Sequence, residues 1–327
     1  MSTVIDASVL DIDAEKESER IAEAIRATVE RTRRKGVVVA VSGGIDSAVV
    51  ATLAVRALGP SRVFALHMPE KESAAETLPL SSELTDWLAI ASTVEDISPI
   101  LAATGCYRRR DAAIRSVVPE YTEAYRSKIV LPSVVDSDAY RLYSVVAEAP
   151  DGTRITRRLT PAAYLEIVAA SNFKQRTRKM LEYFHSDRLN YIVAGTPNRL
   201  EYDQGFFVKL GDGAADIKPI AHLYKTQVYA LAAHLGVPES IRTRPSTTDT
   251  YSLPQSQEEF YFSLPYGRMD LCLYALNHGH AAADVADATG LTPEQVERVF
   301  RDIEQKRRST ACLHAAPTLV EPVAGLV

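Results

Sequence analysis

The order of apolar and polar positions predicts that helices and strands alternate along the first part of the chain. Apolar residues recur at helical spacing between Asp13 and Arg34, with charges between them, which predicts an amphipathic helix. The β-branched run at 37–41 favours a strand covered on both faces, as in a parallel sheet. A buried helix predicted at 48–55 and a strand predicted at 63–67 complete a βαβ unit.

The same alternation continues further along the chain. The pattern predicts helices over 81–90, 172–185 and 223–235, and strands over 94–97 and 191–195. From about residue 257 the chain is expected to be mostly helical, with a helix start at Thr292-Pro293-Glu294. Strands alternating with helices indicate an open α/β fold, a doubly wound parallel sheet with a helical C-terminal part.

One internal segment breaks this rhythm and predicts an insertion. Residues 105–170 begin with the basic run Arg108-Arg109-Arg110, contain several tyrosines, and include the turn Pro150-Asp151-Gly152. A hairpin around that turn is expected. The chain is therefore divided into an N-terminal helix and βαβ half at 1–104, the insertion at 105–170, a second half of the α/β domain with the helical part at 171–311, and a loose tail at 312–327.

Composition narrows the class of protein. The 327 residues carry a net charge of −5 and are 46% hydrophobic, which fits one large globular domain or two small ones and gives no basic footprint for nucleic acid. Cys106, Cys272 and Cys312 form no C-x-x-C pair, so a disulfide framework is not expected. No signal peptide and no apolar run of about 20 residues is present, which predicts a cytoplasmic protein without a membrane partner.

The segment Ser42-Gly43-Gly44-Ile45-Asp46-Ser47 joins a predicted strand to a predicted helix. Two glycines let the backbone approach a ligand, and free amides at a helix start bind anions. A carboxylate at Asp46 would repel phosphates unless a divalent cation lay between them, and Mg²⁺ is commonly held by one or two carboxylates plus phosphates. A plain glycine-rich turn is the alternative interpretation.

This glycine turn is neither a kinase-type P-loop nor a dinucleotide fingerprint, because G-x-x-x-x-G-K-[ST] and G-x-G-x-x-G are both absent. It resembles the S-G-G-x-D-S pyrophosphate loop of ATP pyrophosphatases. Those enzymes cut ATP between the α- and β-phosphates and activate a carboxylate or carbonyl oxygen as its adenylate.

A second polar constellation lies downstream, in the segments 195–201, 205–220 and 223–227. With these segments the chain resembles the ammonia-dependent NAD synthetase family, over about 19–103 and 172–308. The resemblance implies an adenine nucleotide α-hydrolase-like fold. It also implies an AMP-forming carbon–nitrogen ligase that uses ATP, Mg²⁺ and ammonia to convert nicotinic acid adenine dinucleotide to NAD.

The resemblance also implies roles for individual residues. The ATP-binding set is Ser42, Gly43, Gly44, Asp46, Ser47, Thr196, Lys225 and Thr247. The Mg²⁺ ligands are Asp46 and Glu201, and these two with Lys225 form the catalytic set. The dinucleotide-binding set is Arg176, Lys209, Asp216 and Lys306. Each residue alone has a simpler interpretation: a solvated helix face for Arg176, a surface lysine for Lys225, a local cap for Glu201 and a helix end for Lys306.

Several alternatives stay open at this stage. Gln257 stands where the family has an acid, and the insertion is longer than the family's usual link, so amidation of another carboxylic acid by the same adenylate mechanism is the second hypothesis. A tRNA-modifying pyrophosphatase and a non-catalytic ATP-binding module are the others. The resemblance further implies a homodimer. No segment for a glutaminase domain is evident, which implies free ammonia or a separate glutaminase.

Overall fold

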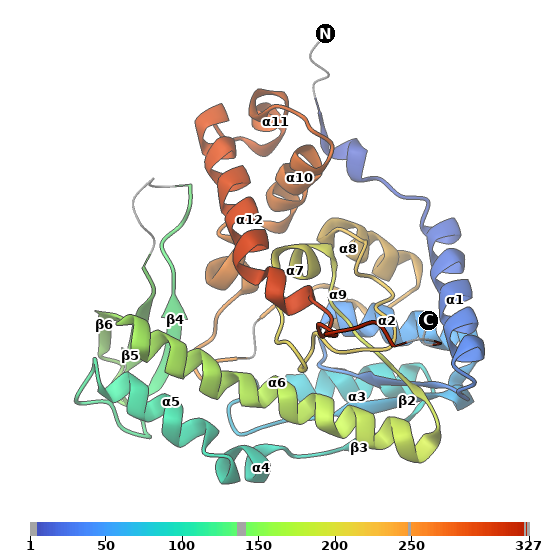
Figure 1. The fold of residues 1–327 in the computed structure, drawn as a ribbon, viewed down its shortest axis with the longest axis horizontal. Coiled ribbons are helices and arrows are strands. Elements are labelled where there is room, and N and C mark those ends of the chain that lie inside the picture. The colour runs from blue at the N-terminus through green and yellow to red at the C-terminus, as the bar shows by residue number, and fades with distance from the viewer. Residues whose placement is uncertain (1–4, 136–141, 248–249, 324, 326–327) are drawn as a thin grey trace.

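A four-stranded parallel sheet lies at the centre of the computed structural model, which describes residues 5–135, 142–247, 250–323 and 325 (Figure 1). Its strands, in spatial order, are β3 (Ala91–Val94), β2 (Val63–His67), β1 (Val37–Ala40) and β7 (Ile192–Ala194). Val37 pairs with Val63 on one side and with Ile192 on the other. The β-branched run therefore forms a central strand, as its continuous hydrophobicity predicted.

Helices cover both faces of this sheet, which confirms the doubly wound α/β fold. Val37 and Val39 pack with residues of α1 (Ala14–Arg31), α2 (Ile45–Leu58), α3 (Thr77–Trp87) and α8 (Lys225–His234). Val38 and Leu66 face the opposite layer, which α4 (Ser98–Ala103), α5 (Cys106–Arg115) and α6 (Pro161–Leu189) supply. Because consecutive strand residues point to opposite faces, one run of valines serves both layers.

Two predicted elements have different bounds in the structure. The strand predicted at 94–97 is β3 at Ala91–Val94, an edge strand with mostly exposed side chains, and the buried Ile97 instead precedes α4. The helix predicted at 172–185 is α6, which runs from Pro161 to Leu189 without interruption. Thr160 accepts a hydrogen bond from Ala163 N and Pro161 occupies the first turn, an N-terminal signal that the sequence analysis did not use.

The predicted insertion contains its own antiparallel sheet, made of β4 (Arg126–Val130), β5 (Ser144–Glu148) and β6 (Arg154–Arg158). The expected hairpin joins β5 to β6, and Gly152 takes the left-handed conformation in its turn with φ of 85°. This sheet packs on α5 and the first turns of α6 around Ile129, Val145 and Ile167. The boundary proposed at 170 therefore falls inside α6.

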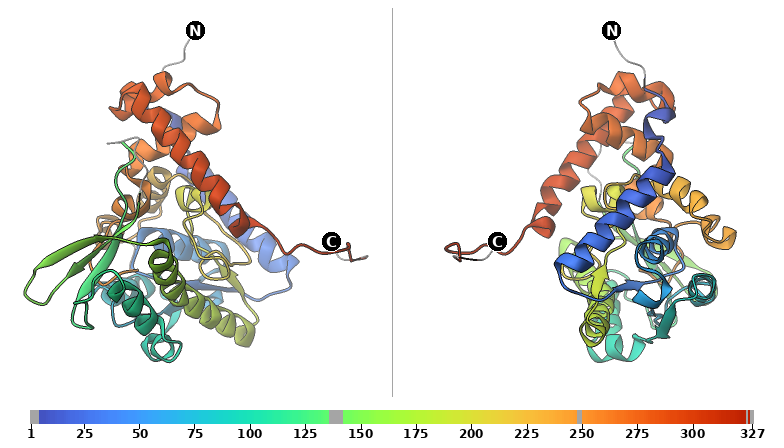
Figure 2. Two further views of the ribbon diagram at one scale, coloured as in Figure 1. Left: turned by 60° about the vertical axis from the view of Figure 1, so that its left-hand side comes forward. Right: turned by 90° about the vertical axis from the view of Figure 1, so that its right-hand side faces the viewer.

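The C-terminal part is helical, as expected, and projects from the sheet (Figure 2). Three helices, α10 (Tyr266–Asn277), α11 (Ala282–Thr289) and α12 (Pro293–His314), enclose a separate apolar core with α7 (Arg199–Gln204). Thr292 caps α12 by accepting a hydrogen bond from Gln295 N. Shorter elements are the 3₁₀ turns Ala7–Leu10 and Pro60–Arg62, the helix α9 (Glu239–Arg242) and a π turn at Glu258–Phe262.

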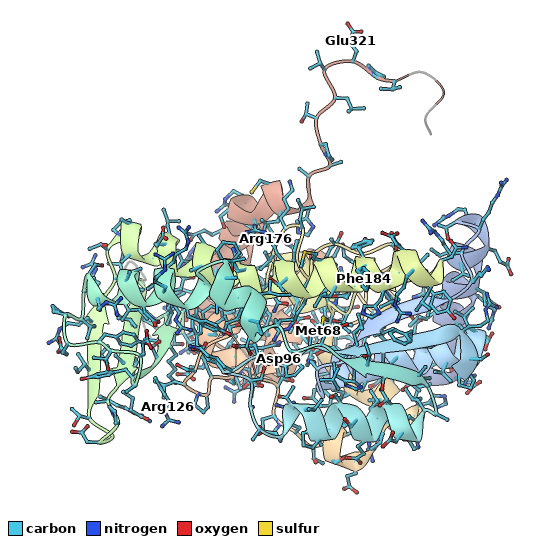
Figure 3. The ribbon with its side chains drawn as sticks, turned by 90° about the horizontal axis from the view of Figure 1, so that it is seen from below. Met68, Asp96, Arg126, Arg176, Phe184 and Glu321 are labelled. Atoms are coloured by element: carbon cyan, nitrogen blue, oxygen red, sulfur yellow. The ribbon has the colours of Figure 1, made fainter. Side chains whose placement is uncertain are left out.

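The tail beyond α12 leaves the body of the molecule, with Glu321 far from it (Figure 3). Its described residues from Ala315 onward are exposed. In the described part of the chain, every helix is too short or too polar to cross a membrane.

Candidate active site

The glycine turn after β1 has the conformation that an anion-binding loop needs. Gly43 has φ of 70°, and a Cβ added there would lie 2.9 Å from the Thr77 carbonyl oxygen, so only glycine fits without strain. Gly44 is the N-cap of α2 and offers no side-chain cap to the first amides of that helix. The hydroxyl of Ser47 donates to Gly44 O (2.9 Å) and accepts from Ser42 N (3.3 Å), which fixes the turn.

Asp46 lies in the first turn of α2, where it pairs with a buried cation. Its Oδ2 forms an ion pair with Nζ of Lys225, the first residue of α8, whose side chain is completely buried. Its Oδ1 accepts a hydrogen bond of 3.1 Å from Nδ2 of Asn198. Burial alone disfavours the ammonium, but the charges of Asp46 and Glu201 together raise the pKa of Lys225.

The second acid, Glu201, is held by a capping box at the start of α7. Its amide donates to Asn198 Oδ1 (3.2 Å), and its Oε2 accepts from Asn198 N (3.1 Å). Its Oε1 accepts from Nε2 of Gln257 (2.9 Å). The carboxylate thus serves as a local cap, as in the simpler interpretation. Hydrogen bonds from Asn198 and Gln257 also fix its orientation.

Asn198 connects the two acids, because its side chain donates to Asp46 while its backbone donates to Glu201. Sequence reasoning missed this residue, although the spacing Asn198-x-x-Glu201 is a capping-box signature that could have revealed it. Burial, followed by the nearby charge of Asp46, raises the pKa of Glu201 to about 8. The negative charges of Asp46 and Glu201 therefore repel each other, and a cation between the two acids would relieve that repulsion.

Both acids line one cavity of about 220 Å³ at the carboxyl edge of the sheet. The sequence-predicted residues that line it are Ser42, Gly44, Asp46, Ser47, Thr196, Glu201 and Thr247. Gly43 and Lys225 are not among its lining residues, and Lys225 lies behind Asp46. The prediction that Asp46 and Glu201 share a cleft therefore agrees with the geometry, whereas a direct contact between Lys225 and a nucleotide in the cavity does not follow from it.

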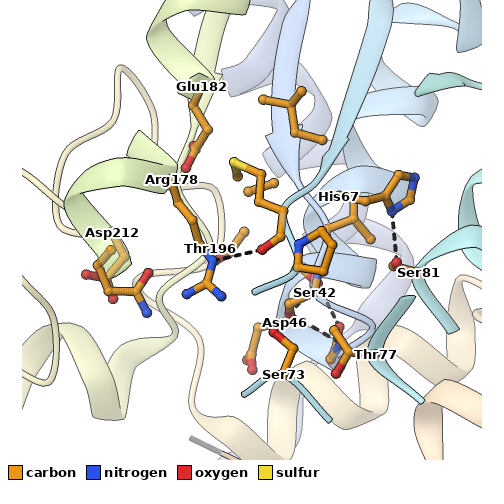
Figure 4. A pocket seen from close by; sticks show the side chains of 18 of the residues that line it. Ser42, Asp46, His67, Ser73, Thr77, Ser81, Arg178, Glu182, Thr196 and Asp212 are labelled. Carbon is orange, nitrogen blue, oxygen red and sulfur yellow. Dashed lines mark hydrogen bonds between the residues drawn. The ribbon is translucent and has the colours of Figure 1, made fainter. Parts of the chain in front are cut away.

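The wall opposite the glycine turn comes from α6 (Figure 4). Arg178 lines the cavity and its Nε donates to the carbonyl of Met68 (3.3 Å). Lys179 and Glu182 form a buried ion pair of 2.7 Å, and burial raises the pKa of Glu182. None of these three residues was predicted from the sequence, because the pattern of charges along a helix does not reveal which of its turns faces a cavity.

The residues that the family resemblance assigns to the dinucleotide separate into two groups. Arg176, Lys209 and Lys306 line a second cavity of about 690 Å³ between α6 and α12. Lys306 is buried and donates to Tyr261 O (2.7 Å), while Lys209 Nζ donates to Cys312 O (2.7 Å) at the end of α12. Asp216 is exposed and lies outside the described cavities, and its Oδ2 accepts from Val193 N (2.7 Å).

A third cavity of about 240 Å³ lies between the other two and has lining residues in common with each of them. It shares Glu201 and Gln257 with the first cavity, and Phe207 and Tyr261 with the second. Its walls are rich in aromatic side chains: Tyr143, Tyr164, Phe206, Phe207, Tyr251, Phe260 and Tyr261. The rings of Tyr143 and Tyr164 stack with centroids 4.2 Å apart, so the insertion contributes to this wall. The three cavities therefore adjoin in a row, from the one at the glycine turn to the one lined by Arg176, Lys209 and Lys306.

Comparison with known proteins gives a consistent result. The family model described as NAD synthase matches residues 17–124 and 146–310, which leaves 125–145 as the unmatched part of the insertion. An NH(3)-dependent NAD(+) synthetase of Rhizobium meliloti is 56% identical over 98% of this chain and 96% of its own length. The enzyme of that name from Thermotoga neapolitana is 36% identical over 87% of this chain and 91% of its own length.

A solved structure has the same fold. The NH3-dependent NAD synthetase from Campylobacter jejuni, solved in complex with the nitrate ion, superposes with a TM-score of 0.63 at 25% identity. The superposition covers 95% of this chain and all of the Campylobacter jejuni chain. The family uses ATP as a substrate, which agrees with a glycine turn shaped for phosphates. Fold, cavity and sequence relationship together show that the chain belongs to the NAD synthase family of ligases.

Proposed function

We propose that this chain is an ammonia-dependent NAD synthetase that adenylates the nicotinate carboxylate of nicotinic acid adenine dinucleotide and then amidates it. The observation that supports this most is the convergence of the glycine turn, which includes Asp46, and of Glu201 on one cavity, from two segments far apart in the chain. The close relatives carry the same activity in their names. That relationship favours NAD synthesis over a tRNA-modifying pyrophosphatase, a non-catalytic nucleotide-binding module or amidation of another acid.

The donor set of the cavity fits a magnesium ion that arrives with the nucleotide. Asp46 and Glu201 supply two carboxylates, and phosphate oxygens and water would complete the six oxygen ligands that Mg²⁺ prefers. Among the described residues, His, Cys, Asp and Glu form no group of three or more that could hold a metal alone. When bound, the ion would offset negative charge on the phosphates.

The chain's own groups would bind and orient the reactants. The uncapped amides at the start of α2 would bind the phosphates, and Lys225 would fix Asp46 from behind while adding positive charge. The substrate carboxylate then attacks the α-phosphorus, pyrophosphate leaves, and ammonia displaces AMP from the acyl-adenylate. Positioning rather than a nucleophilic side chain supplies the catalysis.

The other two cavities would hold the dinucleotide. Its nicotinate end would enter the aromatic cavity beside Glu201, and its phosphates would meet Arg176, Lys209 and Lys306 in the basic one. For Asp216 the hydrogen bond to Val193 N favours a different contribution, which is to hold the polar loop against β7.

Product analysis tests the proposal. The chain is incubated with ATP, Mg²⁺, ammonium and nicotinic acid adenine dinucleotide, and NAD and AMP are measured. Equal amounts of NAD and AMP are expected. AMP release only with some other carboxylic acid would support the second hypothesis instead, and ATP binding without turnover on any acid would support a non-catalytic module.

A variant tests the residue assignment. Asp46→Asn keeps the side-chain shape and an oxygen acceptor for Asn198 but removes the charge that pairs with the buried Nζ of Lys225. The variant should therefore lose stability, and pyrophosphate release by the protein that remains folded should fall at least about a hundredfold. An active Asp46→Asn enzyme would remove the proposed metal role.

We further propose that the protein works in the cytoplasm as a homodimer, with free ammonia or ammonia from a separate glutaminase. Exposed apolar side chains on α6, Leu165, Met180 and Phe184, favour a partner surface on that helix. Light scattering of the purified chain would measure the oligomeric state.

A further inference from the structure

The side chain of Arg244 lies against the glycine turn, from a segment far away in the sequence. Its Nη1 is 3.4 Å from the carbonyl oxygen of Ser42, and its Nη2 is 3.2 Å from Oγ1 of Thr77. A Cβ built on Gly43 would lie 3.3 Å from the same Nη1. The guanidinium therefore contacts the backbone of the turn itself.

This guanidinium is buried, but not all of its N–H groups donate to an acceptor among the described residues. The side chain is only 10% exposed, and its Nε is buried and donates to no acceptor among the described residues. A buried donor without an acceptor costs about 1–3 kcal/mol. The nearest carboxylate, that of Glu76, is 3.5 Å from Nη2 and belongs to a side chain that is 57% exposed. The guanidinium of Arg244 could therefore donate further hydrogen bonds to an anionic ligand.

A small cavity of about 80 Å³ separates Arg244 from the start of α2. It shares Ser42, Gly44, Asp46, Thr247 and Gln257 with the cavity of about 220 Å³ in which ATP is proposed to bind, called the nucleotide cavity below, so the two adjoin across the glycine turn. Arg244 is the only cation among its described lining residues, and the carboxylate of Asp46 is already paired with Lys225. The space suits phosphate groups and is too small for a nucleoside.

We propose that Arg244 binds the β- and γ-phosphates of ATP and then the pyrophosphate that leaves. This rests on the proposed function, in which a carboxylate oxygen bonds to the α-phosphorus while the bond from that phosphorus to the bridging oxygen breaks. The electron pair of the broken bond remains on pyrophosphate, so negative charge increases beside Arg244. The planar fork of arginine can donate two parallel hydrogen bonds to a phosphate, which lysine cannot.

Binding measurements test the site without relying on turnover. The full chain and its Arg244→Gln variant are titrated calorimetrically with magnesium pyrophosphate and, separately, with AMP, which lacks the terminal phosphates. Arg244→Gln should weaken pyrophosphate binding at least tenfold and change AMP binding less than twofold. Arg244→Lys should lie between the two, because it keeps the charge without the fork.

A matched control lies two residues away. Nε of Arg242 donates to Val237 O, and Arg242 lines neither cavity, so Arg242→Gln should bind both ligands like the unmodified chain. Unchanged pyrophosphate binding in Arg244→Gln, or an equal loss of AMP binding, would overturn the proposal. If Arg244→Gln fails to fold, the comparison rests on Arg244→Lys, where undiminished pyrophosphate affinity would contradict it.

These titrations, together with an assay of NAD formation and its inhibition by pyrophosphate, separate this inference from the proposed function. A chain that makes no NAD but binds pyrophosphate through Arg244 would refute the function and keep the site. A chain that makes NAD, with pyrophosphate inhibition unaffected in Arg244→Gln, would keep the function and refute the site.

Discussion

Nζ of Lys225 lies against Oδ2 of Asp46, so the first residue of α8 and the first turn of α2 are joined by an ion pair at the floor of the nucleotide cavity. The lysine is wholly buried, while the carboxylate keeps 17% of its side-chain surface exposed to the cavity. The pair therefore presents its anionic partner to the ligand and hides the cationic one. Several consequences can be measured.

Lys225→Met should destabilise the fold as well as abolish turnover. Removing one partner of a buried pair leaves an uncompensated charge, which typically costs about 3–5 kcal/mol, and the partial exposure of Asp46 favours the lower end. Urea unfolding measures this. The control is Lys128→Met, whose partner Glu259 is 43% exposed, and there the loss should stay below about 1 kcal/mol. Similar losses in the two variants would contradict the structural role assigned to Lys225.

Gly43→Ala should impair ATP binding more than stability. Both Gly43 and Gly59 have positive φ, and Gly59 combines φ of 79° with ψ of 158°, which essentially only glycine adopts, so alanine costs about 1–3 kcal/mol of backbone strain at either site. Only at Gly43 would the new Cβ collide, with the Thr77 carbonyl 2.9 Å away, whereas nothing lies within 4 Å at Gly59. The KM for ATP should therefore rise at least tenfold in Gly43→Ala and stay near normal in Gly59→Ala. Equal KM values would show that the turn does not bind phosphates.

Glu201→Gln and Glu201→Ala should separate the two roles of this side chain. Glutamine can still complete the capping box with Asn198, so its melting temperature should match that of the unmodified chain while kcat falls at least a hundredfold. Alanine removes the cap too and should cost about 1 kcal/mol more in unfolding free energy. A normal kcat in Glu201→Gln would show that Glu201 caps α7 and has no catalytic role.

Acid should weaken the fold through Glu72. This carboxylate accepts hydrogen bonds from Arg110 (2.6 Å) and Lys174 (2.8 Å), and these two cations lower its pKa to about 2 although burial acts in the opposite direction. Because the pKa in the fold lies below the unfolded value of about 4.5, the carboxylate stabilises the fold fully above pH 4.5 and loses that contribution as the pH falls toward 2.

The measurement is the free energy of unfolding as a function of pH. Glu72→Gln should lower it by about 3 kcal/mol at pH 7, and the difference from the unmodified chain should shrink steadily below pH 4.5. Glu123→Gln serves as the control, because Glu123 is exposed. A pH-independent deficit in Glu72→Gln would mean that packing rather than charge accounts for it.

The meeting of Asp46 and Glu201 was predictable from sequence because it follows from topology. β1 and β7 are adjacent parallel strands, so the segments that leave their carboxyl ends share one edge of the sheet. The buried strands, the glycine turn and the helical C-terminal part were predictable for a similar reason, since each has a strong local signature. The edge strand β3 was misplaced because its exposed side chains give no hydrophobic pattern.

Other features depend on contacts between distant segments, which periodicity does not encode. The local sequence favours a surface position for Lys225 on an amphipathic helix, and the packing of α8 on α2 and α10 buries it. The local sequence does not reveal that Arg244 contacts Ser42, which lies 202 positions earlier in the chain. The docking of β4 on the segment after residue 250, through Leu253 N to Ser127 O at 3.1 Å, is of the same kind.

The unbroken course of α6 has a mechanical consequence. Its 29 residues extend about 44 Å at 1.5 Å per residue. The helix therefore reaches from the antiparallel sheet of the insertion to the parallel sheet. The same helix that packs on the antiparallel sheet near Ile167 also carries Arg178 at the nucleotide cavity. Because a long continuous helix is stiff, a force on the antiparallel sheet β4–β5–β6 would tilt the whole of α6. The part of the cavity wall that α6 supplies would then move as well.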